Sequence, residues 1–135
     1  MKTGKRTKAR EFAFKTMFSS QVGKHDILDV LESTLEHDDS KGIKGEIEKR
    51  VITWNKNRKE IDSIIEKHLR KGTLRDVPNV ALCALRLGIC EMEYFDDVPA
   101  EVAINEIVEI SKKFGNESIS GFVNAIMDER LKSRL

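Results

Sequence analysis

A chain of 135 residues is long enough to bury the core of one globular domain without a disulfide or a structural metal. With only 8 glycines and 2 prolines, its composition favours helices over turn-rich β structure. The longest apolar run, residues 80–85, is too short to cross a bilayer, and no signal-peptide stretch follows the basic amino terminus. We therefore expect a cytoplasmic protein that does not bind membranes, with Cys83 and Cys90 buried and reduced.

The charges are sorted along the chain, although the net charge is only +1. Residues 1–22 carry six basic side chains and one acidic one, and residues 67–75 carry four basic side chains and no acidic one. Residues 26–39 carry six acids and no Lys or Arg. The two basic stretches are therefore candidate binding sites for a polyanion such as nucleic acid.

Apolar residues recur at helical spacing through most of the first half of the chain. This spacing predicts a first helix over residues 7–22 and a second helix that begins after Asp26 as its N-cap. From residue 43 to residue 72 the pattern predicts one long helix, or two collinear helices with a break at 55–57.

The tripeptide Asp-Val-Pro occurs at 76–78 and again at 97–99, each time ahead of an apolar periodic segment. Both copies predict a helix start, with the aspartates as caps, and Ser118 is the expected cap of a last helix. The expected fold is all-α: six or seven helices in two packed small bundles, within a single domain covering residues 1–135, with a subdomain junction near residue 75.

Sequence patterns for catalysis are missing. The three histidines are not at metal-ligand spacing, and there is no GxGxxG, GxxxxGK[ST] or GxSxG motif. Adjacent acids such as Asp38 and Asp39 are typical of a solvated surface. We expect no metal, no cofactor and no enzymatic activity.

Three ordered stretches resemble the NusB family of transcription antitermination factors. Residues 9–18 (AREFAFKTMF) are similar to the family opening ARExAxxxLY, and residues 85–92 (LRLGICEM) resemble its LRxxxxEL helix. The third and strongest match is VPAEVAINE at 98–106, followed by ISKKFG at 110–115 and FVN at 122–124. The chain departs from the family at its leader, which is poor in arginine, and at Phe18, where tyrosine is frequent; residues 23–60 match only in helical character.

The resemblance implies an all-α protein of two small helical bundles without a cofactor or catalytic turnover. It implies pairing with the small-subunit ribosomal protein NusE, binding to boxA-type single-stranded RNA, and membership of the antitermination complex with RNA polymerase. Whether the free protein is a monomer or a homodimer stays open.

The predicted RNA-binding residues form two basic clusters and one aromatic platform. They are Lys2, Lys5, Arg6, Lys8 and Arg10 near the amino terminus, His68, Arg70 and Lys71 near the middle, and Phe122. Phe18 is the predicted partner-binding residue, and both phenylalanines have core packing as the alternative.

This interpretation requires the two basic clusters to lie side by side as one groove. Arg6 and Arg10 are four residues apart and are expected to share a helix face. Reversing both to Glu is then expected to weaken RNA binding and to leave the melting curve nearly unchanged.

Two alternatives remain open at the sequence level. One is a helical adaptor or self-associating dimer that binds protein and never RNA. The other is a detached NusB-like domain of an RNA cytosine methyltransferase, although residues 1–135 contain no nucleotide-binding βαβ pattern.

Overall fold

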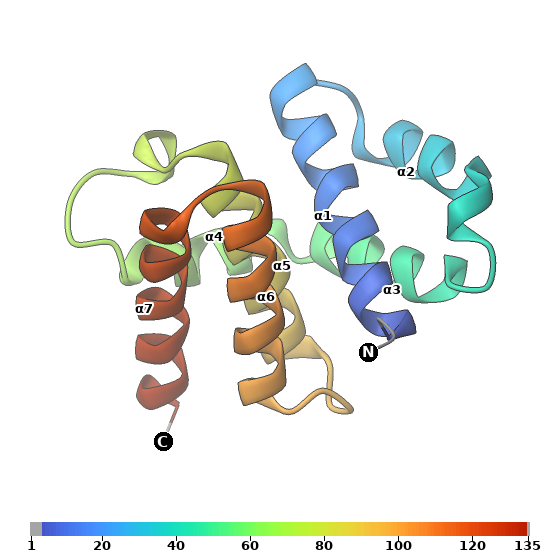
Figure 1. Ribbon diagram of the computed structural model, residues 1–135. Helices are drawn as coiled ribbons and strands as arrows, with labels where there is room; N and C mark the ends of the chain where they lie inside the picture. Colours follow the sequence, from blue (N-terminus) through green and yellow to red (C-terminus); the bar gives the residue numbers. More distant parts are fainter. Residues whose placement is uncertain (1–3, 135) are drawn as a thin grey trace.

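Helix α5 (Asn79–Tyr94) forms the centre of the computed structural model, which describes residues 4–134. Five helices contact it, namely α1 (Lys5–Gly23), α3 (Lys44–Lys56), α4 (Arg58–Lys67), α6 (Ala100–Phe114) and α7 (Glu117–Ser133). Helix α2 (Ile27–Glu36) packs against α1 and α3 (Figure 1). Two short 3-10 turns, Asp38–Ser40 and Leu74–Asp76, complete the described structure.

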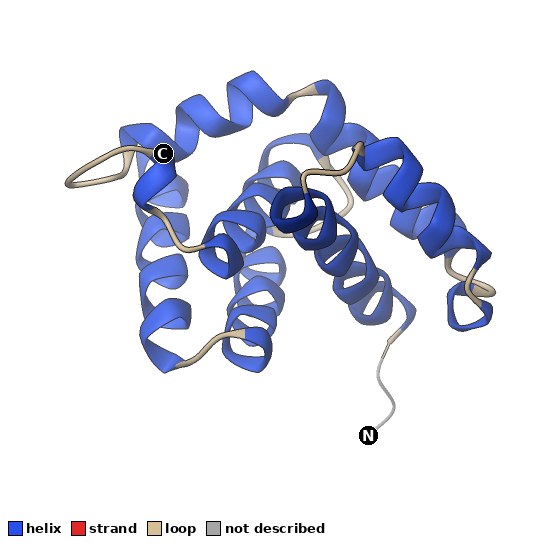
Figure 2. Cartoon of the chain, turned by 90° about the horizontal axis from the view of Figure 1, so that it is seen from above, coloured by secondary structure: helices blue, strands red, loops and turns tan. Residues whose placement is uncertain are grey.

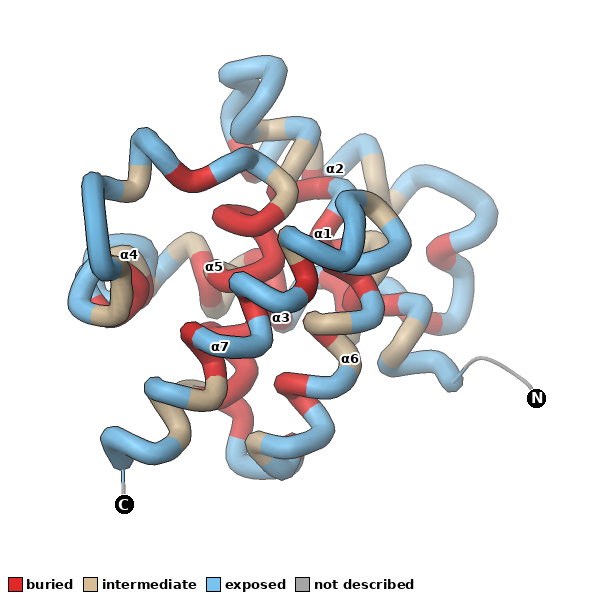
Figure 3. Tube along the Cα trace, turned by 60° about the vertical axis from the view of Figure 1, so that its left-hand side comes forward, coloured by how far each residue is buried: buried red, intermediate tan, exposed pale blue. Residues whose placement is uncertain are grey.

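Helix α5 is central because it is apolar around most of its circumference. Residues 81–85 and 87–92 are all buried, so every side of the helix is covered by a neighbour (Figure 3). Gly88 allows the closest approach, since a Cβ there would lie 2.6 Å from Met127 and 3.1 Å from Ile107. A side chain at this position would push α6 and α7 away from α5.

The all-α prediction is confirmed: residues 4–134 form seven α-helices and no strand (Figure 2). Helices α1, α2 and α3 contact one another, and α4, α6 and α7 all contact α5. The subdomain junction predicted near residue 75 stays a prediction.

The predicted helix boundaries hold more often than the predicted caps. Helices α3 and α4 break at Asn57, and new helices begin directly after both Asp-Val-Pro tripeptides, as expected. However, Asp76 accepts a hydrogen bond from the backbone of Thr73 in its own turn, and Asp97 pairs with a distant arginine. Asn116, instead of Ser118, caps α7 by accepting a hydrogen bond from the backbone of Ile119.

A buried carboxylate ties three helices together. Glu91 of α5 has no exposed surface and accepts hydrogen bonds from Nε of Arg10 on α1, at 2.8 and 2.9 Å. It also accepts one from Nε of Arg50 on α3, at 2.6 Å. Both arginines are buried too, with exposed fractions of 2% and 0%. Burying these charges is tolerated because each is paired and hydrogen-bonded.

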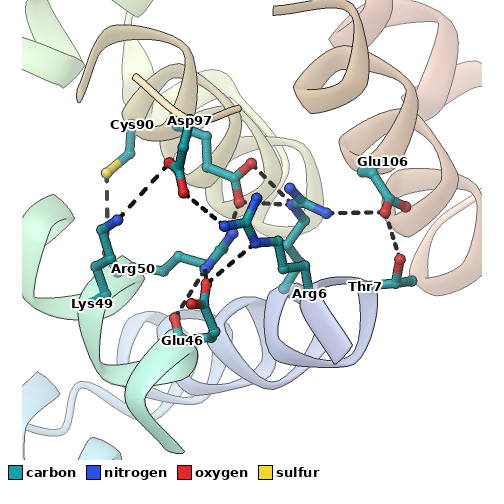
Figure 4. A network of polar contacts seen from close by, with 10 residues as sticks. Arg6, Thr7, Glu46, Lys49, Arg50, Cys90, Asp97 and Glu106 are labelled. Atoms are coloured by element: carbon teal, nitrogen blue, oxygen red, sulfur yellow. Dashed lines mark hydrogen bonds and ion pairs between the residues drawn. The ribbon is translucent and has the colours of Figure 1, made fainter. Parts of the chain in front are cut away.

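Two further glutamates extend this network towards the surface (Figure 4). Glu46 accepts a 2.7 Å hydrogen bond from Arg50, which holds the pKa of that carboxyl below its ordinary value. Glu106 of α6 accepts a 2.9 Å hydrogen bond from Arg10 and another from the hydroxyl of Thr7. The network therefore fixes α1 against α3, α5 and α6 together.

Replacing Glu91 with Gln should destabilise the fold strongly, because two buried arginine charges would lose their shared counter-charge. We expect the free energy of unfolding, measured by urea titration with circular dichroism, to fall by about 3–5 kcal/mol. The control is Glu109→Gln on the exposed side of α6, which should change it by less than about 0.5 kcal/mol. Equal effects of the two substitutions would show that the network does not stabilise the fold.

Candidate nucleic-acid interface

The first basic cluster lies on the opening turns of α1. Lys5 and Lys8 are exposed, and neither forms an ion pair within residues 4–134. Arg6 is less free to bind a phosphate, because its guanidinium lies 2.6 Å from Asp97 and 3.8 Å from Glu46. The predicted contact Lys2 lies outside the described residues.

Arg10 does not belong to this exposed cluster. Its side chain is 2% exposed and is engaged by Glu91 and Glu106. A spacing of four residues rotates a side chain by about 40° around the helix. That rotation carries Arg10 into the core, while Arg6 stays at the edge. The prediction that both arginines contact RNA from one exposed face is therefore wrong for Arg10.

The two arginines should consequently behave differently when their charge is reversed. Arg10→Glu would place a third carboxylate beside Glu91 and Glu106, and we expect a loss of at least about 4 kcal/mol of stability. Arg6→Glu removes only half-exposed ion pairs and should cost no more than about 1 kcal/mol. Thermal melts of the two single variants test this, and similar melting temperatures would contradict the assignment.

The second basic cluster lines a groove between the end of α4 and the first turns of α7. His68, Arg70 and Lys71 line a cavity of about 780 Å³ together with Phe122 and Glu129. Glu129 lies 3.6 Å from Nδ1 of His68 and 3.8 Å from the guanidinium of Arg70, whose side chain is nevertheless 91% exposed. Phe122 is 38% exposed, so its ring belongs to the surface and is available for stacking.

The two clusters lie at opposite ends of α5. The second cluster is near the start of that helix, because Pro78 and Ala81 line the same groove. The first is near its end, where Arg6 meets Asp97. The 16 residues of α5 span about 24 Å, and Figures 1 and 2 show the start of α1 far from the loop that follows α4. The prediction of a single groove built from both clusters is wrong.

A patch of lysines and aromatic rings lies where α1 meets the end of α6. Nζ of Lys15 is 5.4 Å from the centre of the Phe114 ring, and Nζ of Lys113 is 5.5 Å from the same centre. Lys113 also pairs with Glu11 at 2.7 Å. We call Lys15, Lys113 and Phe114 the α1–α6 patch.

The α1–α6 patch lies between the two predicted clusters. Lys15 is two helical turns beyond Lys8 and lies on the same side of α1. At the other end, a Cβ on Gly115 would lie 3.1 Å from Ile119, which lines the Phe122 groove. Sequence reasoning missed this patch, although Lys113 and Phe114 stand in the third family motif, because the α1–α6 contact is not visible in the sequence.

Phe18 is the outer ring of an aromatic stack. Its ring centre is 5.9 Å from that of Phe14, which in turn lies 5.2 Å from that of Phe114. Phe18 is partly buried, so one part of the ring packs and another part faces solvent. It joins the α1–α6 patch to the last turns of α1.

Features of other site classes are scarce in the described part of the chain. No group of His, Cys, Asp or Glu there could hold a metal ion. Burial raises the pKa of both cysteine thiols, Cys83 and Cys90, to about 12, which keeps them protonated. No helix among residues 4–134 is long and apolar enough to span a membrane.

Residues 7–132 match the family model described as the NusB family. The chain belongs to the NusB family. It is 36% identical over 129 residues to the transcription antitermination protein NusB of Pseudothermotoga lettingae, covering 96% of this chain and 92% of that relative. The resemblance seen in the sequence is thereby confirmed.

Solved structures of NusB proteins have the same fold. NusB from T. maritima aligns with a TM-score of 0.87 at 32% identity, covering 98% of this chain and 93% of that one. A crystal structure of the antitermination factors NusB and NusE in complex with dsRNA aligns with a TM-score of 0.87 at 27% identity, covering 96% and 97%.

All three NusB-like motif stretches contribute a residue to the buried network. Arg10 comes from the first stretch, Glu91 from the second and Glu106 from the third. These motif residues therefore hold the helices of the NusB fold in place, and the exposed cations and rings around them are the candidates for ligand contact.

Proposed function

We propose that this chain is a transcription antitermination factor that binds boxA-type single-stranded RNA and pairs with the ribosomal protein NusE, in the complex with RNA polymerase. The observation that carries the proposal is the exposed Phe122 ring beside Arg70 and Lys71 in an open groove. An exposed ring flanked by cations is the arrangement that binds unpaired bases and their phosphates. The role needs no catalytic turnover and is carried out in the cytoplasm, on nascent RNA.

The RNA path is proposed to be extended. It begins at Lys5 and Lys8, passes the α1–α6 patch and ends in the Phe122 groove. Its cations neutralise phosphates, while Phe122 and His68 hold bases. The two clusters lie at opposite ends of α5, which is about 24 Å long. A single strand that follows the surface can contact both of them.

NusE is proposed to contact the exposed part of Phe18. The ring is already supported from behind by Phe14 and Phe114, so little side-chain freedom is lost when a partner covers it. Its position beside the α1–α6 patch would bring the partner next to the RNA.

Two alternatives are distinguished by direct binding measurements. A protein-binding adaptor or homodimer predicts no RNA complex, with or without NusE. A methyltransferase domain predicts binding of S-adenosylmethionine. The chain aligns over more than nine-tenths of its length with the NusB relative from Pseudothermotoga lettingae and with the T. maritima NusB structure, which favours a role like that of NusB.

An electrophoretic mobility shift with boxA RNA, with and without NusE, tests the proposal. Phe122→Ala should weaken binding on the order of tenfold, because base stacking contributes about 1–3 kcal/mol. The matched control is Val102→Ala, an exposed apolar residue on α6 with 42% exposure, which should bind like the wild type. Absence of any RNA complex in both lanes would favour the adaptor. A duplex of the same sequence in a parallel lane compares paired with unpaired RNA.

Salt dependence tests the extended path. For single-stranded RNA we expect a slope of about −3 for log affinity against log salt, if roughly four phosphates are neutralised. Lys8→Gln combined with Lys15→Gln should make the slope shallower by about 1.4, since each lysine accounts for about 0.7. A flat response of the wild type, or an unchanged slope in the double variant, would contradict this path.

A further inference from the structure

A second groove opens on the other side of α1. It has a volume of about 620 Å³ and lies between the end of α1, the start of α2 and the junction of α3 with α4. Met17 and Ser20 of α1 line it, and they lie about 120–180° around the helix from Lys8 and Lys15. This groove is therefore not part of the proposed RNA path.

Arg58 presents an open guanidinium in this groove. Its Cζ stacks 4.2 Å from the centre of the Trp54 ring, and its Nε donates to Asn55 at 2.9 Å. No carboxylate within residues 4–134 forms an ion pair with it. Arg86 also approaches the Trp54 ring, at 5.6 Å, but Asp62 binds its guanidinium with two hydrogen bonds of 2.9 and 3.0 Å. Of these two arginines, only Arg58 lacks a carboxylate partner among the described residues, so its guanidinium can pair with a ligand carboxylate.

Lys24 adds a second cation to the lining. It is exposed, and it ends α1 in the left-handed conformation with φ of 56°, a geometry that favours glycine. No ion pair with Lys24 occurs in the described chain. Asp26 also lines the groove, but one of its oxygens caps α2 by accepting from the backbone of Leu28 at 2.9 Å.

Exposed aliphatic surface adjoins these cations. Leu28 lines the groove and is 49% exposed. It is the most exposed large hydrophobic side chain of the groove lining. Aliphatic surface next to cations is complementary to a protein segment in which an apolar side chain stands beside an acidic one.

Nucleic acid fits this groove poorly. Asp29, Glu32 and Glu36 are exposed on α2, and their charges oppose an extended phosphate backbone more than one carboxylate held at the far end of the groove. The lining holds two aromatic rings, the imidazole of His25 and the indole of Trp54, and the indole is only 3% exposed, which leaves little of it for base stacking. A single carboxylate needs only the Arg58 and Lys24 end of the groove.

We propose that this groove docks an acidic segment of a protein partner, with a carboxylate on Arg58 and Lys24 and an apolar side chain on Leu28. The site is independent of the proposed RNA path, so the chain can hold both ligands at once.

Trp54 is the only tryptophan of the chain, so its fluorescence reports on this groove directly. The probe is a capped synthetic peptide of about ten residues in which one Asp-Leu pair is flanked by uncharged residues, titrated into the full chain. We expect a saturable change in emission, and a matched peptide with Asn in place of Asp should bind at least tenfold more weakly. Arg58→Gln should weaken binding of the acidic peptide by about tenfold, which corresponds to about 1.4 kcal/mol.

Two further variants complete the experiment. Leu28→Gln should also weaken peptide binding, while Lys59→Gln, an exposed neighbour outside the lining, should bind like the wild type. Thermal melts confirm that all three variants fold. Absence of a saturable change, equal binding of the acidic and amide peptides, or full affinity in Arg58→Gln would overturn the proposal.

RNA separates this inference from the proposed function. boxA RNA should leave Trp54 emission unchanged, and Arg58→Gln should bind RNA normally in the mobility shift. A Trp54 response to RNA that Arg58→Gln abolishes would assign the groove to nucleic acid and overturn the docking of an acidic segment. Failure of RNA binding in the wild type would contradict the proposed function and leave the peptide result standing.

Discussion

The pairing of Glu91 with Arg10 and Arg50 determines how the other parts of the structure are placed. One carboxylate without solvent contact receives hydrogen bonds from two helices, and both arginines reach a further glutamate nearer the surface. Charges buried at this depth are tolerated because each is paired with an opposite charge, although Nη2 of Arg50 has no hydrogen-bond partner among the described residues. Because α1 is held by this network, the cations on its outer side and the groove on its other side both have fixed positions.

Fold class was predictable from the sequence because helical periodicity, scarce glycine and the two Asp-Val-Pro tripeptides all indicate the same structure. The break at Asn57 and the helix starts after Pro78 and Pro99 follow from local signals, and the structure has them. Cap assignments were less predictable. Asp97 accepts a hydrogen bond from Arg6, which is far away in the sequence. Such a long-range contact leaves no pattern in the residues around Asp97.

The candidate site was predictable only in part. Exposed Lys5 and Lys8, and Phe122 beside Arg70, follow from composition and the family motif. The burial of Arg10 could not be predicted, because the sequence of a basic stretch does not show which residue faces solvent and which faces a buried glutamate. The separation of the two clusters was hidden for a similar reason: it depends on the length and direction of α5, which local periodicity does not place in space.

Two residues of α5, Gly88 and Glu91, must each face a particular set of neighbouring helices. Gly88 must face α6 and α7, where a Cβ would meet Met127, and Glu91 must face the arginines of α1 and α3. Each residue added to a helix rotates all later side chains by about 100° around its axis. An insertion or deletion between these positions would turn one of the two residues away from its partners. The middle of α5 should therefore keep a constant length among relatives of this chain. Length variation is expected in the connecting loops and outer helices.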